Sequence, residues 1–223
     1  MFRERYLKRT FDIIISMIGI IVLSPLLLLL ALLIKLEGII RPSTNGPVIH
    51  SEIRISKGRP FGILKFRTVR GHLLEIVRRN PQGQSQSYIQ HKPGALTYMG
   101  KFLTKYYLDE LPQVFNILKG EMTFVGPRPQ EALRYKHELK EGQYCLRDLR
   151  SGLCGLAQAS KRNSKLRQAL IEVHRTGHAH PKLMTLDTIY FSKYKKYSDL
   201  QLLFYDIKVM AMTLRVNFRG EGV

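Results

Sequence analysis

The chain has 223 residues, enough for one compact domain and an anchoring segment but too few for two full domains. Lysine and arginine outnumber aspartate and glutamate by 36 to 17, giving a formal net charge of +19. This surplus attracts anions, so the partners to consider are nucleic acid, anionic lipid and phosphorylated substrates. Cys145 and Cys154 are the only cysteines, and their spacing indicates neither a disulfide framework nor a zinc site. We expect two free thiols in a reducing cytoplasm.

The N-terminal region holds an apolar segment, Ile13 to Ile34, that contains no charged residue. At about 1.5 Å per residue, such a helix can cross a hydrocarbon core of about 30 Å. A helix in a soluble core would normally show a polar face, which this segment lacks. A cleavable signal peptide would have a shorter apolar region and a small-residue cleavage site, but Lys35 and Glu37 follow directly. The sequence therefore predicts a helix inserted into a membrane.

The flanks and the middle of this segment bear on its orientation. Basic residues stand on both sides, so the positive-inside tendency does not place the two ends on opposite faces. Pro25 follows Ser24 in the middle, and its missing N–H predicts a kink. We expect a kinked, re-entrant helix within residues 1–37, followed by a cytoplasmic catalytic domain over residues 38–223. A straight single pass is the alternative.

Two strands are predicted next, at Val48–Ile55 and Phe61–Val69, joined by a turn over residues 56–60. Period-two alternation in the second strand places Lys65 and Arg67 on one face, about 7 Å apart. Two cations in this arrangement would suit two anionic oxygens of a diphosphate. The alternative is a solvated edge strand that carries charge against aggregation.

The rest of the chain is predicted to be mainly helical, with loops rich in glycine, proline and polar residues. The predicted segments are a short helix at His72–Arg79, a loop at Asn80–Gly94, a helix at Thr97–Tyr107, a helix from Pro112 to a C-cap at Gly120, a charged helix after Pro129 to about Glu141, a loop at Ser151–Ser160, and basic amphipathic helices within Leu183–Phe218. These last helices lie on an anionic membrane surface, pack onto the core, or do both. The fold class is α/β, mostly helical with a small sheet.

Asp109 and Glu110 stand directly before the helix predicted from Pro112. Free N–H groups and the helix dipole there stabilise negative charge, so both carboxylates should stay ionised. Taken alone, an acidic pair in this position is usually a helix cap.

Three histidines near the C-terminal third, His174, His178 and His180, can be interpreted as a metal cluster. Gly177 and Pro181 interrupt any helix that would align them, so solvated histidines are the preferred interpretation.

The string around the acidic pair changes its interpretation. YLDELPQVFNILKGEMTFVGPRP, from Tyr107 to Pro129, resembles the signature of the bacterial sugar transferase family, the monotopic phosphoglycosyl transferases that begin lipid-linked glycan assembly. The likeness covers nearly the whole chain and includes KRTFD, the apolar segment with its Ser-Pro break, GPVIHSEIRISKGRPFGILKFRT and SGLCGLAQAS. The resemblance implies transfer of a sugar-1-phosphate from a nucleotide diphosphosugar, a UDP-sugar, to polyprenyl (undecaprenyl) phosphate with release of UMP. This would be the first step of exopolysaccharide, O-antigen or glycoprotein assembly.

The resemblance also implies roles for the acidic pair. Asp109 would be the nucleophile, attacking a phosphorus of the donor and carrying a covalent phosphosugar that polyprenyl phosphate then attacks. Glu110 would hold Mg²⁺, which usually binds through few carboxylates together with substrate phosphates. The metal would offset the repulsion between Asp109 and the anionic diphosphate.

The same resemblance implies that basic residues stabilise phosphate charge. Lys65, Arg67 and Arg128 would do so, the main task of the protein in phosphoryl transfer. The turn of Pro127, Arg128 and Pro129 would display Arg128 on a fixed backbone and contact the uridine end of the donor. A purely structural turn with an exposed arginine is the alternative.

Some positions depart from the family pattern. Thr104 stands where the family often has arginine, and residues 92–94 read Lys-Pro-Gly rather than Asp-Pro-Arg. Residues 151–156 read Ser-Gly-Leu-Cys-Gly-Leu rather than Pro-Gly-Ile-Thr-Gly-Leu, and Lys161 replaces a glycine. These changes leave Asp109 and Glu110 in place, and they bear on donor sugar and rate more than on reaction class.

The combined prediction is an enzyme on the cytoplasmic face of the bacterial inner membrane. Its partners are the nucleotide-sugar donor, polyprenyl phosphate and membrane lipid, with Mg²⁺ as cofactor and no nucleic acid; a homodimer is left open. Two rivals remain: a catalytically weakened scaffold of the same family, and a membrane-tethered nucleic-acid-binding protein whose binding would be salt-sensitive.

Overall fold

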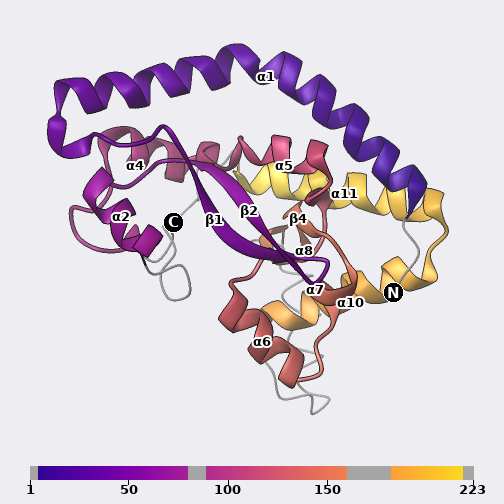
Figure 1. Ribbon diagram of the computed structural model, residues 1–223. Coiled ribbons are helices and arrows are strands. Elements are labelled where there is room, and N and C mark those ends of the chain that lie inside the picture. Colours follow the sequence, from indigo (N-terminus) through magenta and orange to yellow (C-terminus); the bar gives the residue numbers. More distant parts are fainter. Residues whose placement is uncertain (1–4, 80–88, 160–181, 218–223) are drawn as a thin grey trace.

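A computed structural model describes residues 5–79, 89–159 and 182–217, and these residues form a mostly helical fold with two small two-stranded sheets (Figure 1). The histidines at 174, 178 and 180, and most of the loop predicted over residues 80–94, lie outside the described residues. The elements are α1 (Tyr6–Ile40), η1 (Pro42–Thr44), β1 (Ile49–Ser56), β2 (Arg59–Phe66), α2 (Gly71–Arg79), α4 (Tyr98–Lys105), η2 (Leu108–Glu110), α5 (Gln113–Lys119), β3 (Met122–Val125), α6 (Ala132–Lys140), α7 (Cys145–Asp148), β4 (Ser151–Cys154), α8 (Leu156–Ala159), α10 (Lys182–Lys196) and α11 (Asp199–Asn217).

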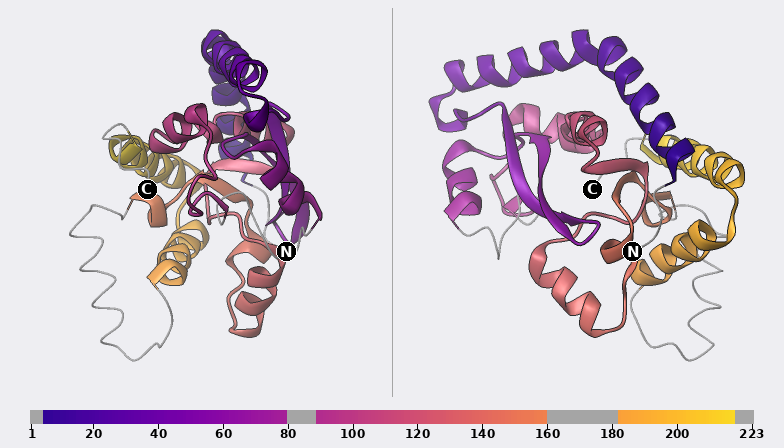
Figure 2. Two further views of the ribbon diagram at one scale, coloured as in Figure 1. Left: turned by 90° about the vertical axis from the view of Figure 1, so that its left-hand side faces the viewer. Right: turned by 45° about the vertical axis from the view of Figure 1, so that its right-hand side comes forward.

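Helix α1 is one continuous helix that arches along an edge of the molecule, with α6 at the opposite edge (Figures 1 and 2). Pro25 lies inside it and has no N–H to offer the carbonyl of Ile21. The Ser24 hydroxyl donates to that carbonyl instead, at 2.8 Å. The Ser-Pro pair therefore leaves the helix unbroken, and a re-entrant path through a membrane stays a prediction.

The N-terminal part of α1 is tied into the core by charged side chains. Lys8 Nζ donates to the carbonyl of Val125 at 2.9 Å and to Asp206 Oδ2 at 2.5 Å. Asp12 accepts hydrogen bonds from the Thr123 hydroxyl and from the backbone N–H of Phe124. These polar groups of α1 are buried, so they anchor the helix to β3 and α11.

The C-terminal part of α1 is held by an apolar contact and a cap. Leu30 and Ile34 are buried in a cluster with Phe66 and Leu103. Glu37 accepts from the backbone N–H groups of Tyr98 and Met99, at 2.8 and 3.1 Å, and so satisfies free donors at the start of α4.

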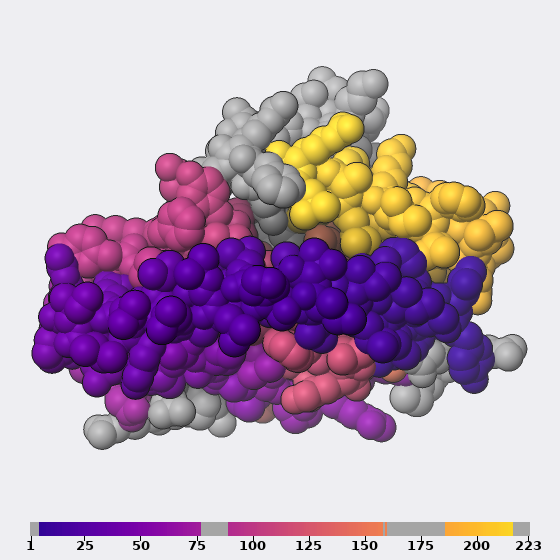
Figure 3. All heavy atoms as spheres, turned by 90° about the horizontal axis from the view of Figure 1, so that it is seen from above, coloured from indigo at the N-terminus to yellow at the C-terminus, as the bar shows by residue number. Residues whose placement is uncertain are grey.

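The outward side of α1 remains uncovered. Figure 3 shows α1 stretched across one face, with α4 and α11 beside it. Among the described residues, α1 is the one helix long and apolar enough to cross a membrane, with a mean hydropathy of 3.0 in its most apolar window. Its exposed apolar side chains include Ile14, Ile18, Ile21, Val22, Leu28 and Leu32.

Strands β1 and β2 form an antiparallel hairpin, confirming the two predicted strands with small shifts of their ends. Lys57 and Gly58 connect them, with φ of 51° and 72°. Positive φ at both central residues matches the right-handed twist of a tight hairpin. The register places His50 opposite Lys65.

Strands β3 and β4 form a second, parallel pair, so the loop predicted at Ser151–Ser160 is wrong: this segment contains β4 and α8. A local pattern search misses β4 because glycine and serine are poor strand formers. The strand exists because β3, distant in sequence, pairs with it. A Cβ on Gly152 would lie 2.1 Å from the backbone nitrogen of Gly126, so the pairing also requires glycine there.

Helices α10 and α11 pack onto the main hydrophobic cluster, to which they contribute Leu186, Tyr190 and Val209. The Tyr190 hydroxyl contacts the Val125 carbonyl at 3.0 Å and Asp206 at 2.9 Å. Packing onto the core, one of the two alternatives for this region, is therefore confirmed. Exposed apolar residues still remain on α11, among them Leu200, Phe204, Ile207 and Leu214.

Candidate active site

Asp109 and Glu110 lie in η2, a single turn between α4 and α5. Tyr107 precedes this turn with a φ of 57°, a left-handed conformation that bulky residues rarely adopt. Helix α5 begins after Pro112 and receives no side-chain cap. The position before a helix is confirmed, but the interpretation of the pair as a cap of α5 is wrong.

Asp109 is buried, with 5% of its surface exposed, while Glu110 is half-buried. Burial raises the pKa of Asp109 to about 7, opposed by the charge of Lys65 and reinforced by Glu110 and Glu52. Burial therefore opposes the ionisation expected for Asp109 at the helix terminus.

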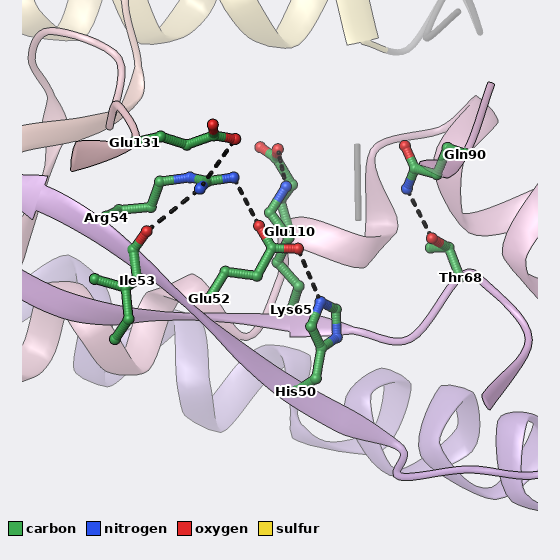
Figure 4. A network of polar contacts seen from close by, with 9 residues as sticks. All are labelled: His50, Glu52, Ile53, Arg54, Lys65, Thr68, Gln90, Glu110 and Glu131. Atoms are coloured by element: carbon green, nitrogen blue, oxygen red, sulfur yellow. Dashed lines mark hydrogen bonds and ion pairs between the residues drawn. The ribbon is translucent and has the colours of Figure 1, made fainter. Parts of the chain in front are cut away.

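Lys65 is the cation next to this pair, at the end of β2. Its Nζ donates to Glu110 Oε1 at 3.1 Å, and its side chain is buried (Figure 4). Burial alone would lower the pKa of Lys65, but the charges of Glu110, Asp109 and Glu52 outweigh it and raise the pKa. Lys65 is therefore held as a cation between carboxylates.

A chain of polar residues on β1 extends the site (Figure 4). Glu52 contacts His50 Nε2 at 3.2 Å through one oxygen and accepts from Arg54 at 2.7 Å through the other. Arg54 also forms an ion pair of 3.4 Å with Glu131. Burial alone would raise the pKa of Glu52, but the hydrogen bond from His50 and the charges of Arg54 and Lys65 lower it to about 2.

The sequence prediction assigned no role to His50, Glu52 or Arg54. The signal was present, because the three residues alternate along a predicted strand and must share a face. Period-two spacing of histidine, glutamate and arginine on a mostly buried strand is unusual, since buried charges need partners.

A pocket of about 240 Å³ opens beside these residues. It is rich in cations, which an anionic ligand requires, and two carboxylates also face it. The lining residues are Arg54, Ile63, Lys65, Glu110, Gln113, Arg128, Pro129, Gln130, Glu131, Arg134, Gly152 and Leu153. Four of the seven residues with a predicted site role thus line one pocket, namely Lys65, Glu110, Arg128 and Pro129. Asp109 is buried within electrostatic reach of Lys65, whereas Arg67 and Pro127 do not line the pocket.

Arg67 is not brought to this pocket. Its guanidinium donates to the carbonyls of Pro47 and Val69, at 3.0 and 3.1 Å, and it is almost fully buried. Strand β2 ends at Phe66, so the alternation that pairs Arg67 with Lys65 does not continue past that residue. A phosphate-binding role for Arg67 stays a prediction.

The Pro127–Pro129 turn follows β3 and is fixed by backbone contacts. The carbonyl of Pro127 accepts from Gly152 N–H at 2.8 Å. Asp187 of α10 accepts a hydrogen bond from the backbone N–H of Arg128, while burial raises the pKa of Asp187 to about 7. The turn therefore holds Arg128 and Pro129 at the pocket, whereas Pro127 lies at the junction with β4.

The donor set beside the pocket suits a hard cation. Glu110 faces the pocket, and Mg²⁺ needs only one or two carboxylates when phosphate oxygens complete its coordination. Among the described residues, no group of three histidine, cysteine or acidic side chains forms a complete metal site. Glu110 would therefore hold Mg²⁺ together with a phosphorylated substrate rather than in a closed protein cage.

Several known proteins are similar in sequence to this chain over most of its length. The model of the family described as bacterial sugar transferase matches residues 3–215. An exopolysaccharide production protein, ExoY, of Sinorhizobium fredii is 32% identical over 92% of this chain and 86% of its own length. An undecaprenyl-phosphate galactose phosphotransferase of Salmonella typhimurium is 31% identical over 98% of this chain but 42% of its own length.

An uncharacterized sugar transferase of Haemophilus influenzae is 38% identical over 72% of this chain and 34% of its own length. The chain thus spans about a third of that relative, under half of the Salmonella protein and most of ExoY. The family model covers the acidic pair, Lys65 and the Pro127–Pro129 turn, and the chain belongs to the bacterial sugar transferase family.

Proposed function

We propose that this protein transfers a sugar-1-phosphate from a UDP-sugar to polyprenyl phosphate at the cytoplasmic face of the bacterial inner membrane. The observation that carries the proposal is the buried Asp109 beside the Lys65–Glu110 ion pair, at a pocket lined by four cationic side chains. Similarity to the Salmonella relative, an undecaprenyl-phosphate galactose phosphotransferase, supports the lipid acceptor.

In the first half-reaction, an oxygen of the ionised Asp109 attacks the phosphorus that carries the sugar. A bond from carboxylate oxygen to phosphorus forms, and the bond to the bridging oxygen breaks, so UMP leaves with that electron pair. Lys65 and Arg128 stabilise the charge that builds up on the phosphoryl oxygens. Mg²⁺ held by Glu110 would supply a Lewis acid that reduces repulsion between the two anions.

In the second half-reaction, a phosphate oxygen of polyprenyl phosphate attacks the phosphorus of the aspartyl phosphosugar. The Asp109 carboxylate leaves, and the lipid carries the sugar diphosphate away. Two chemically similar displacements at one carboxylate need a single pocket open to both substrates in turn. The pocket lined by Lys65, Glu110 and Arg128 and the apolar helix α1 support access for a soluble donor and a lipid acceptor to one site.

The proposed site lies at the membrane because α1 inserts there as a re-entrant helix. Its exposed apolar side chains and the net charge of +19 support placement of the helix at a membrane. A lipid phosphate and a soluble nucleotide sugar meet most easily at such an interface.

The activity is tested with the purified full chain, Mg²⁺, polyprenyl phosphate and a panel of UDP-sugars, by measuring UMP. We expect release with at least one donor and none with Asp109→Asn. Asp199→Asn is the matched control, since Asp199 is far more exposed and pairs with Arg5 on another part of the fold. Absence of UMP with every donor, from folded protein, contradicts the activity. Release that survives Asp109→Asn contradicts the nucleophile alone.

The path of α1 is tested by cysteines placed at its two ends, Tyr6→Cys and Ile40→Cys, where both native side chains are exposed. Both native cysteines are buried, so background labelling is low. A re-entrant helix exposes both introduced thiols to a membrane-impermeant reagent on the cytoplasmic side. Labelling of the two ends from opposite sides shows a full span instead.

A further inference from the structure

Gln113 is a buried polar residue with an unused hydrogen-bond donor. It is the first residue of α5, only 2% of its surface is exposed, and it lines the pocket together with Lys65 and Glu110. Its Nε2 has no hydrogen-bond partner. Buried amide groups are nearly always paired in folded proteins, so such an atom needs an explanation.

Asn116, one helical turn later on α5, provides the contrast. It is equally buried, and its Nδ2 donates to the carbonyl of Gly62 at 2.8 Å and to Glu121 at 2.6 Å. Its Oδ1 accepts from the N–H of Leu64 at 2.9 Å. Asn116 therefore fastens α5 to β2, whereas the amide nitrogen of Gln113 makes no such bond.

Leaving a buried donor unpaired destabilises the fold, so a side chain kept only for packing would favour an apolar residue here. Gln113 stands three residues after Glu110, which places both side chains on the same side of the helical turn. The available partner for its Nε2 is therefore a ligand in the pocket.

We propose that Gln113 is a substrate-contacting residue whose side-chain amide donates a hydrogen bond to a phosphate oxygen of the donor diphosphate. The inference rests on the proposed function for the identity of that ligand. The chemistry of the pocket favours phosphate, since Arg54, Lys65, Arg128 and Arg134 line it. An uncharged donor adds stabilisation of the phosphoryl oxygens without adding another cation beside the Asp109 carboxylate.

The test compares Gln113→Met with Asn116→Met in the full chain. Methionine keeps the length of the side chain and removes the N–H donor. Two quantities are measured for each variant: the melting temperature without ligand, and the affinity for inorganic pyrophosphate with Mg²⁺ by calorimetry. A structural role and a ligand-binding role predict opposite patterns.

For Gln113→Met we expect an unchanged or higher melting temperature and pyrophosphate binding weaker by about tenfold or more, as for loss of a hydrogen bond to a charged group. For Asn116→Met we expect a lower melting temperature. The inference is overturned if Gln113→Met binds pyrophosphate like the wild type, or if it loses as much thermal stability as Asn116→Met.

Turnover separates this inference from the proposed function. Pyrophosphate binding that depends on Gln113, in a protein that releases no UMP from any donor, upholds the phosphate contact and rejects the activity. UMP release with kcat/KM unchanged in Gln113→Met upholds the activity and rejects the contact. A loss confined to the KM for polyprenyl phosphate also rejects the contact, because the donor is then bound without Gln113.

Discussion

Lys65 Nζ lies 3.1 Å from Glu110 Oε1, and the buried Asp109 is the second carboxylate that its charge stabilises. One ammonium group thus serves two adjacent acids, so its loss should affect both. Lys65→Met leaves Glu110 without this partner and removes the main interaction that opposes the raised pKa of Asp109. We expect kcat/KM for UMP release to fall by about 10²–10³, as for loss of one charge-stabilising donor.

The matched control for Lys65→Met is Lys119→Met, because Lys119 is exposed on α5. A comparable fall in the control would mean that net charge, rather than the position of Lys65, sets the rate.

The rate should depend on pH through Asp109. Burial raises the pKa of this carboxyl to about 7, so the nucleophilic form is lost as pH falls below that value and gained as pH rises through it. We expect kcat/KM, measured at low Mg²⁺, to fall about tenfold per pH unit on the acid side of this pKa. A flat profile across neutral pH contradicts a raised pKa of Asp109 in the working enzyme.

The free energy of unfolding should depend on pH through the ionisation of Glu52. Its pKa is lowered from the ordinary 4.5 to about 2, so its stabilising effect is complete above pH 4.5 and is lost as pH falls toward 2. The shift corresponds to about 3 kcal/mol of unfolding free energy. We expect Glu52→Gln to melt lower than the wild type at neutral pH, and the difference to shrink on acidification. A constant difference across that range assigns the loss to packing rather than charge.

The backbone passes so close to Gly152 that no side chain should fit at this position. A Cβ there would lie 2.1 Å from the nitrogen of Gly126 and 2.6 Å from the carbonyl oxygen of Cys154. We expect Gly152→Ala to cost about 1–3 kcal/mol or more and to displace the Pro127–Pro129 turn, lowering both melting temperature and UMP release. Gly19→Ala is the control, since its Cβ meets only an ordinary contact at 3.8 Å. Equal stability of the two variants contradicts the steric argument.

The two thiols should be unreactive in the folded protein. Burial raises the pKa of both Cys145 and Cys154 to about 12, so little thiolate is present. We expect a thiol-specific reagent at mildly alkaline pH to label neither cysteine until denaturant is added. Rapid labelling of the native protein, located by mass spectrometry, identifies a cysteine that the fold does not protect.

Local patterns were sufficient for the elements whose cause is local. The hairpin follows from two apolar runs around Lys57 and Gly58, and α5 ends where Gly120 adopts a φ of 84°. The pair β3–β4 could not be predicted this way, because β4 has almost no strand propensity and owes its conformation to β3 and to the contact between Gly126 and Gly152.

The site was predictable as a set of residues but not as an electrostatic arrangement. The string around Asp109 identified the acids, and the family resemblance identified Lys65, for which strand alternation alone left a solvated edge strand as the alternative. The burial of Asp109 is a tertiary property, and so is the end of β2 at Phe66, which directs Arg67 to the carbonyls of Pro47 and Val69. His50, Glu52 and Arg54 share a face by spacing alone, but only the fold shows that they extend the polar chain to Glu131.

Helix α1 is fastened at both ends, by Lys8 and Asp12 to the core and by Glu37 to α4. The helix and the rest of the chain therefore fold as one unit. The boundary predicted after residue 37 would separate only their functions. Deleting the helix to obtain a water-soluble enzyme would leave Asp206 without its ion-pair partner and would expose the apolar cluster around Phe66 to solvent. It would also remove the cap of α4. Solubility is better sought by replacing outward residues such as Ile21 and Leu28 with polar ones, while the inward side of the helix is kept intact.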